Sequence, residues 1–205
     1  MYSSLPTFVI GFHGCDEEIQ KKVLLGQEEL IASDNKYDWL GKGIYFWENN
    51  PTRAMEFAEE IKDHPDRHKT IIKKPAVVGA IIDVGRCVNL LDSRYIKNLK
   101  KVYNLLKDTA DKAGYVLPEN KNLDEGGFSL KRNLDCAVID VLHKVNENAG
   151  NSPYDTLRGV FVEGGRLYPD AGFFKKSHIQ VCVRNPNCIK GYFNPREIVG
   201  NFQLP

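Results

Sequence analysis

Four residues near the start of the chain have the types and spacing expected of a site for a flat, polar ligand. His13 and Gly14 follow a short apolar run, where a histidine can donate to a ligand hydroxyl and a glycine lets a ligand approach the backbone closely. Tyr45 lies in the segment GKGIYFWE, and Phe57 follows twelve residues later. Two facing aromatic rings would form a slot for a flat heteroaromatic ring.

Each of these residues also has an ordinary structural interpretation. His13 can be a half-buried residue at a strand end, and the glycines before Tyr45 can form a turn. Tyr45 can be a core aromatic whose hydroxyl is hydrogen-bonded, while Phe57 fits the apolar stripe of a helix. The four residues taken singly therefore leave both interpretations open.

The elements that must position these residues are predicted from hydrophobic periodicity and helix-start signals. Asn50 followed by Pro51 indicates a helix start, and Ala54, Phe57 and Ala58 continue it at helical spacing. We expect further helices over 17–31, 92–114 and 129–147, and a loop over 116–127. Strands are expected over 7–13, 43–48, 75–85, 158–165 and 177–185.

This order of elements predicts an α+β fold in a single domain covering residues 1–205. The first half runs strand, helix, strand, helix, strand, and the chain ends with strands. The helical stretch over about 90–150 is interpreted as an insertion that packs on the same core. A length of 205 residues and a mass of 23.2 kDa suit one domain of this kind.

Composition excludes several classes of protein. Hydrophobic residues make up 42% of the chain and charged residues 27%, and the net charge of +1 gives no global attraction to nucleic acid or to an anionic membrane. No apolar run approaches the roughly 20 residues of a membrane span, so we expect no membrane partner. The five cysteines are scattered and form no CxxC pair, so the sequence predicts no disulfide framework, no metal and a cytoplasmic location.

The segments FHG and GKGIYF, with an aromatic residue twelve positions after the tyrosine, carry a resemblance. They resemble the nicotinamide-binding segments of the poly(ADP-ribose) polymerase group of the ADP-ribosyltransferases, over about residues 8–60. The resemblance implies a split β-sheet core and NAD as substrate. It also implies that His13 contacts a ribose of NAD and that the backbone of Gly14 binds the carboxamide. Tyr45 and Phe57 would then stack on the two faces of the nicotinamide ring.

The third motif of that family is a glutamate at the start of a late strand, after a loop that meets the acceptor. The matching position here is Gln180 in SHIQVCVRN, which strand alternation places with His178 and Cys182 on the face opposite the apolar residues. Glu163 in FVEGG is the competing candidate, and it can equally be an exposed strand end. The acceptor loop would be the segment between them, with Tyr168, Phe173 and Phe174 as contacts.

The resemblance implies transfer of a single ADP-ribose unit from NAD to a macromolecular acceptor, either protein, RNA or DNA. Glutamine can hydrogen-bond a ribose hydroxyl but cannot act as a base, which favours single transfer over polymer synthesis. Family likeness further suggests a bacterial toxin or phage-defence effector, with an antitoxin protein as partner. Two alternatives remain: a binding module for NAD or ADP-ribose without catalysis, and an RNA 2′-phosphotransferase of the same fold.

Overall fold

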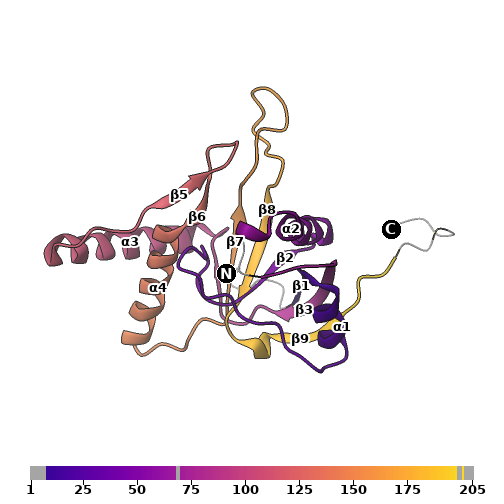
Figure 1. Ribbon diagram of the computed structural model, residues 1–205. Coiled ribbons are helices and arrows are strands. Elements are labelled where there is room, and N and C mark those ends of the chain that lie inside the picture. The colour runs from indigo at the N-terminus through magenta and orange to yellow at the C-terminus, as the bar shows by residue number, and fades with distance from the viewer. Residues whose placement is uncertain (1–7, 68–69, 198–199, 201–205) are drawn as a thin grey trace.

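A seven-stranded sheet forms the centre of the protein in this computed structural model, which describes residues 8–67, 70–197 and 200 (Figure 1). Its order within the described residues is β4-β7-β8-β2-β1-β3-β9, and the neighbouring strands are antiparallel except for β4 and β7, which are parallel. The strands are β1 Phe8–Asp16, β2 Ile44–Glu48, β3 Pro75–Asp83, β4 Cys87–Asn89, β7 Thr156–Phe161, β8 His178–Val183 and β9 Ile189–Phe193.

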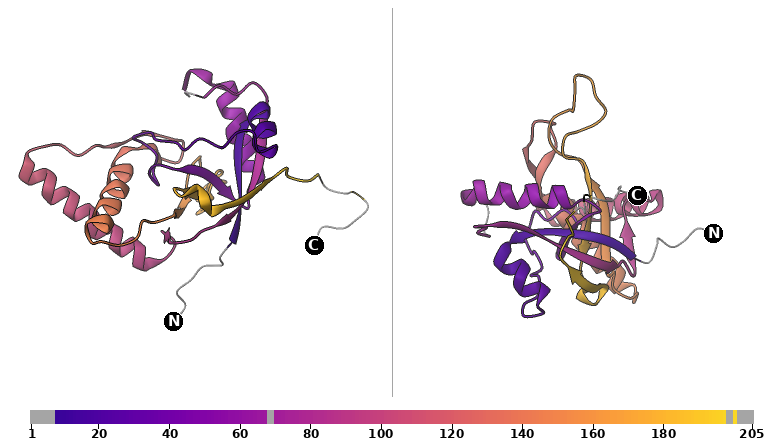
Figure 2. Two further views of the ribbon diagram at one scale, coloured as in Figure 1. Left: turned by 90° about the horizontal axis from the view of Figure 1, so that it is seen from below. Right: turned by 90° about the vertical axis from the view of Figure 1, so that its right-hand side faces the viewer.

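Four α-helices and a separate two-stranded hairpin make up the rest of the regular structure within the described residues. The helices are α1 Glu17–Leu24, α2 Pro51–Asp63, α3 Ser93–Ala113 and α4 Asn133–Asn148, and the hairpin joins β5 Asn120–Leu123 to β6 Ser129–Arg132. Short 3-10 turns occur at Pro65–Arg67 and Pro186–Cys188. Figure 2 shows α3 and α4 together on one side of the molecule, away from α1 and α2.

The two strands that carry the predicted site separate after a short stretch of pairing. Strand β1 pairs with β3 along its whole length, but it pairs with β2 only through Gly11↔Glu48 and Phe12↔Trp47. Strand β2 instead pairs with β8 from Ile44 to Trp47. The sheet is therefore continuous on both sides of a gap that opens between β1 and β2.

Apolar side chains bury both faces of the sheet. On one face, here called the α1 face, Phe46 and Val181 pack with Val23 of α1. The opposite face, here called the α2 face, carries α2 over β1 and β3, and α3 with α4 over β7 and β8. The residues that join α3 and α4 to the sheet form one cluster: Leu40, Val88, Val102, Leu106, Val138, Ile139, Leu142, Leu157 and Cys182.

The structure confirms the α+β class and most of the predicted elements. Asn50 caps α2 by accepting from the Arg53 backbone N–H at 2.9 Å, and Pro51 is its first residue. Within the stretch over 90–150, α3 and α4 pack on the sheet through the cluster around Leu157 and Cys182. No helix in the described part of the chain is both long and apolar enough to cross a membrane.

Several boundaries were predicted wrongly. The first helix ends at Leu24 instead of residue 31, because the chain turns at Gly26 with a φ of +68°, a conformation that glycine adopts without strain. The predicted loop over 116–127 contains β5, and residues 129–132 form β6 ahead of α4. Strands β4 and β9 were not predicted, and Thr7, the expected start of the first strand, lies outside the described residues.

Candidate functional site

The gap between β1 and β2 is bordered by the backbone of Gly14. The carbonyl of Ile10 accepts from Asn49 N–H at 3.0 Å, so the backbone groups of Ile10 face β2. Amide groups of alternate residues in a strand point to the same side, which aims N–H and C=O of Gly14 at the gap beyond the last β1–β2 pair. A Cβ at Gly14 would lie 2.1 Å from the Ala54 carbonyl oxygen, so only glycine allows α2 to approach this closely.

His13 bridges the two strands where they separate. Its Nδ1 lies 2.8 Å from the carbonyl oxygen of Tyr45, which can only accept, so this nitrogen is the donor. The imidazole packs on the α1 face, 5.8 Å from the ring of Phe46. Burial lowers the pKa of His13, so its ring is neutral at neutral pH. The imidazole of His13 and the phenol of Tyr45 consequently project from opposite faces of the sheet.

The hydroxyl of Tyr45 is held by the segment that precedes its own strand. It accepts from the backbone N–H of Leu40 at 3.1 Å and donates to the carbonyl of Gly41 at 2.8 Å. The ring packs with Leu40, Leu157 and Cys182 on the α2 face. Burial raises the pKa of Tyr45 well above its ordinary value, so the phenol stays protonated.

Phe57 meets a different aromatic residue of β2 from the one predicted. Its ring centroid lies 4.9 Å from that of Trp47, with the planes tilted by 46°. Tyr45 and Trp47 share the α2 face, but the Tyr45 ring belongs to the cluster under α3 and α4. Helix α2 thus packs over Trp47, two residues further along β2 than Tyr45, and the slot between Tyr45 and Phe57 stays a prediction.

Gln180 lies on the same face of the sheet as Tyr45 and Trp47. It pairs with Trp47 across β2–β8 and with Gly159 across β7–β8. Its Oε1 accepts from the indole Nε1 of Trp39 at 2.7 Å. The alternation predicted for β8 is correct, but both faces of the strand are covered, since Cys182 and Val183 are each almost fully buried.

Aromatic rings surround Gln180, and three of the side chains involved were not identified from sequence. Trp39 lies 5.2 Å from Phe161, whose ring stacks on His178 at 5.5 Å, and His178 is 6.0 Å from Trp47. The guanidinium of Arg132, ahead of α4, lies 4.2 Å above the Phe161 ring. Trp39, Phe161 and Arg132 come from three separate segments, and no spacing in the sequence connects them.

His178 is neutral in this environment. Its Nδ1 lies 2.6 Å from the Lys176 carbonyl oxygen and therefore donates to it. Burial, helped by the nearby Arg53 guanidinium, lowers the pKa of His178 to about 4.

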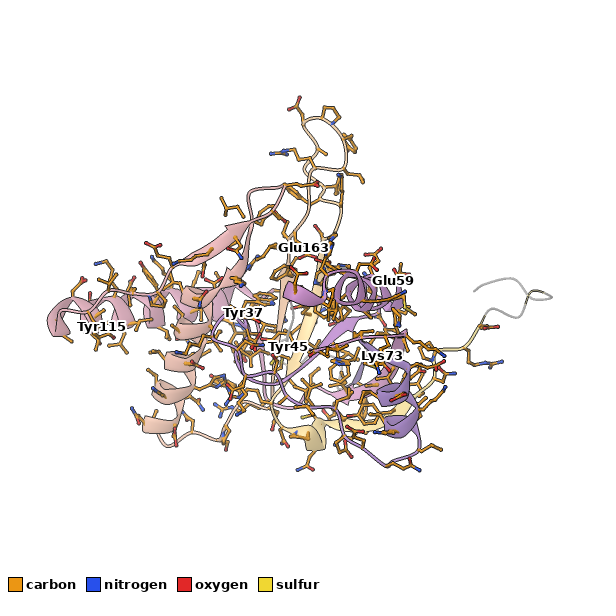
Figure 3. The ribbon with its side chains drawn as sticks, viewed as in Figure 1. Tyr37, Tyr45, Glu59, Lys73, Tyr115 and Glu163 are labelled. Atoms are coloured by element: carbon orange, nitrogen blue, oxygen red, sulfur yellow. The ribbon has the colours of Figure 1, made fainter. Side chains whose placement is uncertain are left out.

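Glu163 forms an ion pair with Arg53 and is not an exposed strand end. Strand β7 ends at Phe161, and the Glu163 carboxylate accepts from the Arg53 guanidinium in the first turn of α2. Only 12% of the Glu163 side chain and 7% of that of Arg53 are exposed. Figure 3 shows Glu163 beside α2, at the base of the loop between β7 and β8. This carboxylate is thus held by a cation.

The predicted acceptor loop projects from the body of the protein at the top of Figure 1. Tyr168 and Phe173 are 54% and 67% exposed, as a contact surface requires, whereas Phe174 packs edge-on against Phe128 at 4.8 Å. Lys175 and Lys176 pair with Glu125 and Glu60, which ties the end of the loop to the hairpin and to α2.

The fold therefore brings some of the predicted residues together and separates others. The ring of Tyr45 and the amide of Gln180 lie on the α2 face, and the backbone of Gly14 borders the gap between β1 and β2. The His13 ring lies on the α1 face. The described residues include no group of three or more histidine, cysteine or acidic side chains that could hold a metal ion.

Comparisons with known proteins give one distant relative. The chain is 24% identical over 198 residues to a protein of Methanocaldococcus jannaschii named "Uncharacterized protein MJ0359", covering 87% of this chain and 83% of the relative. That name states no activity. No family model matches the chain, and no solved structure matches it.

Proposed function

We propose that the protein transfers a single ADP-ribose unit from NAD to a macromolecular acceptor. The observation that carries the proposal is the end of β1–β2 pairing at Phe12↔Trp47, beyond which the backbone amide groups of Gly14 face β2 without a paired residue in the ladder. A backbone N–H and C=O together complement a carboxamide, which has one acceptor oxygen and an NH₂ donor. The carboxamide of nicotinamide is such a group.

Gln180 and its surroundings would act at the ribose next to the breaking bond. Loss of nicotinamide develops oxocarbenium character in that ribose, so a contact that holds the ribose in the reactive geometry while the bond breaks would raise the rate. Gln180 pairs in register with Trp47, on the face that carries Tyr45. The exposed Tyr168 and Phe173 of the β7–β8 loop would meet the acceptor. A toxin or phage-defence role with an antitoxin partner belongs to the proposal through the family resemblance alone.

The experiment uses NAD labelled in its adenylate part, the purified protein and a cell lysate. We expect label in a macromolecular fraction, and digestion with nuclease or with protease tells which class of acceptor carries it. Gln180→Ala is expected to lower the rate by about 10² to 10³ with NAD affinity little changed, the scale of one transition-state hydrogen bond. If the folded parent protein labels no macromolecule in the lysate, the transfer reaction is refuted.

A second candidate is a module that binds NAD or ADP-ribose without reacting it. The observation in its favour is that the hydrogen-bonding groups of the site are already engaged: the Tyr45 hydroxyl by residues 40 and 41, and Glu163 by Arg53. Calorimetric titration with NAD separates the two, because a binding module binds NAD at full affinity and yields no labelled acceptor and no free nicotinamide.

A further inference from the structure

Trp39 fixes the direction in which the Gln180 side chain can form hydrogen bonds. The indole Nε1 of Trp39 lies 2.7 Å from Oε1 of Gln180. An indole N–H can only donate, so the amide must turn its carbonyl oxygen toward Trp39. The NH₂ group of Gln180 then points away from the indole. A glutamine amide can present either its acceptor oxygen or its NH₂ donor to a ligand, and the contact with Trp39 leaves only the NH₂ donor for this role.

The indole is itself immobilised from three directions. A Cβ at Gly159 would lie 2.6 Å from the Trp39 ring, so the ring rests directly on the backbone of β7. The ring centroid of Phe161 lies 5.2 Å from that of Trp39 in an edge-on arrangement. The Arg132 guanidinium carbon lies 5.2 Å from the centroid of the same Trp39 ring. The next residue, Leu40, is fully buried and donates its backbone N–H to the Tyr45 hydroxyl.

Residues 39–41 therefore form a support that is fixed by its contacts with the sheet and with α4. The Gly41 carbonyl accepts from Tyr45, and a Cβ at Gly41 would lie 2.9 Å from Ile139 of α4. One short segment, held by the helices that follow β4, thus contacts the functional groups of both Tyr45 and Gln180.

We propose that Trp39 is a positioning residue that holds Gln180 as a hydrogen-bond donor toward the substrate. The proposal rests on the proposed function and adds the polarity of the contact: the substrate atom facing Gln180 is an accepting oxygen, such as a ribose hydroxyl oxygen of NAD. A carboxylate at this position would accept from a ribose hydroxyl instead. An amide cannot act as a base, so the proton that the acceptor's nucleophile loses as it bonds to the ribose carbon and nicotinamide leaves must go to solvent.

The first test compares Trp39→Phe, Gln180→Ala and the double variant in the labelling assay. Phenylalanine keeps an aromatic ring over Gly159 but lacks the N–H. We expect Trp39→Phe to lower the transfer rate about tenfold, the upper scale of one neutral hydrogen bond, with NAD affinity within about twofold of the parent's. Since Trp39 acts through Gln180, Trp39→Phe should have no further effect in the Gln180→Ala background. Additive losses, or parent rates in Trp39→Phe, overturn the proposal.

The second test does not depend on activity. The chain contains two tryptophans, Trp39 and Trp47, so a nitrogen–proton NMR spectrum shows two indole signals, and Trp47→Phe assigns them. Gln180→Ala should move the Trp39 signal upfield and leave that of Trp47, whose N–H has no hydrogen-bond partner among the described residues, nearly in place. An unmoved Trp39 signal overturns the hydrogen bond.

Titration with NAD tells failure of this inference from failure of the proposed function. The NH₂ signals of Gln180 should shift on addition of NAD to the parent, and the shift should be reduced in Trp39→Phe. A parent that binds NAD with this shift but labels nothing refutes transfer and keeps the positioning role. A parent that labels its acceptor while the Gln180 signals stay unmoved refutes the positioning role and keeps transfer.

Discussion

A methyl group added at Gly14 would test the close contact between β1 and α2 on which the candidate site depends. The Cβ of Gly14→Ala would lie 2.1 Å from the Ala54 carbonyl oxygen and 3.2 Å from the Ala58 Cβ. Because carbon–oxygen contacts normally begin at about 3.3 Å, α2 and β1 must separate by roughly 1 Å. Overpacking of this kind costs about 1 to 3 kcal/mol of unfolding free energy.

Urea unfolding of Gly14→Ala and Gly191→Ala measures this cost against a matched control. Gly191 lies in strand β9, and a Cβ there meets no heavy atom within 4 Å. We expect Gly14→Ala to be less stable than Gly191→Ala by at least about 1 kcal/mol. It should also bind NAD more weakly, because the Gly14 backbone and Phe57 on α2 would move apart. Equal urea midpoints for the two variants would refute the close approach of α2 to Gly14. An unchanged NAD affinity in a destabilised Gly14→Ala would show that NAD does not bind at the gap.

Three further predictions concern side chains whose partners the structure identifies. Tyr45→Phe should lower the free energy of unfolding by about 1 to 3 kcal/mol, because Leu40 N–H and Gly41 C=O lose their shared hydroxyl; urea unfolding checks this, and an unchanged midpoint contradicts it. Glu163→Ala should destabilise by roughly 3 kcal/mol, because the buried Arg53 would be left with the half-exposed Glu56, 3.8 Å away, in place of the close Glu163 carboxylate. A second change, Arg53→Met, should recover most of the loss, and a double variant less stable than Glu163→Ala would show that the Arg53–Glu163 pair itself stabilises. His178 has a pKa of about 4 in the fold and about 6.5 when unfolded, so unfolding takes up a proton in that window and the free energy of unfolding should fall by roughly 3 kcal/mol as pH drops from about 6.5 to about 4. His178→Asn should flatten this dependence in part, since His143 has a similarly lowered pKa, and an equally steep profile in the variant would rule out His178 as the source.

Local signals in the sequence were sufficient where a single residue decides the structure. The Asn50-Pro51 pair predicted the start of α2, because cap and first-turn preferences act within one turn. Alternation correctly separated Gln180 and Cys182 from Val181 on β8. Strand β5 was missed because its residues, NKNL, include no β-branched residue, and it exists only through pairing with β6.

The geometry of the candidate site depends on contacts between distant segments, which no local pattern encodes. Tyr45 and Trp47 lie on one face of β2, and the position at which α2 crosses that face decides which ring meets Phe57. The Trp39–Gln180 hydrogen bond joins residues 141 positions apart. Glu163 was interpreted as a possible exposed strand end because its partner, Arg53, lies on a helix 110 positions earlier.

The parallel pairing of β4 with β7 determines how the chain can be shortened. Cys87 lies opposite Thr156, and Asn89 lies opposite Arg158, so the chain enters both strands from the same end of the sheet. A tight turn can join antiparallel neighbours only, since a parallel neighbour requires a connection that runs back along the first strand. Excising α3, the β5–β6 hairpin and α4 and closing the ends with a two-residue turn would therefore reverse β7 and uncover Leu157 and Cys182. The segment that resembles an insertion is the return path of the fold, and natural or engineered variants should tolerate changes in its length but not its loss.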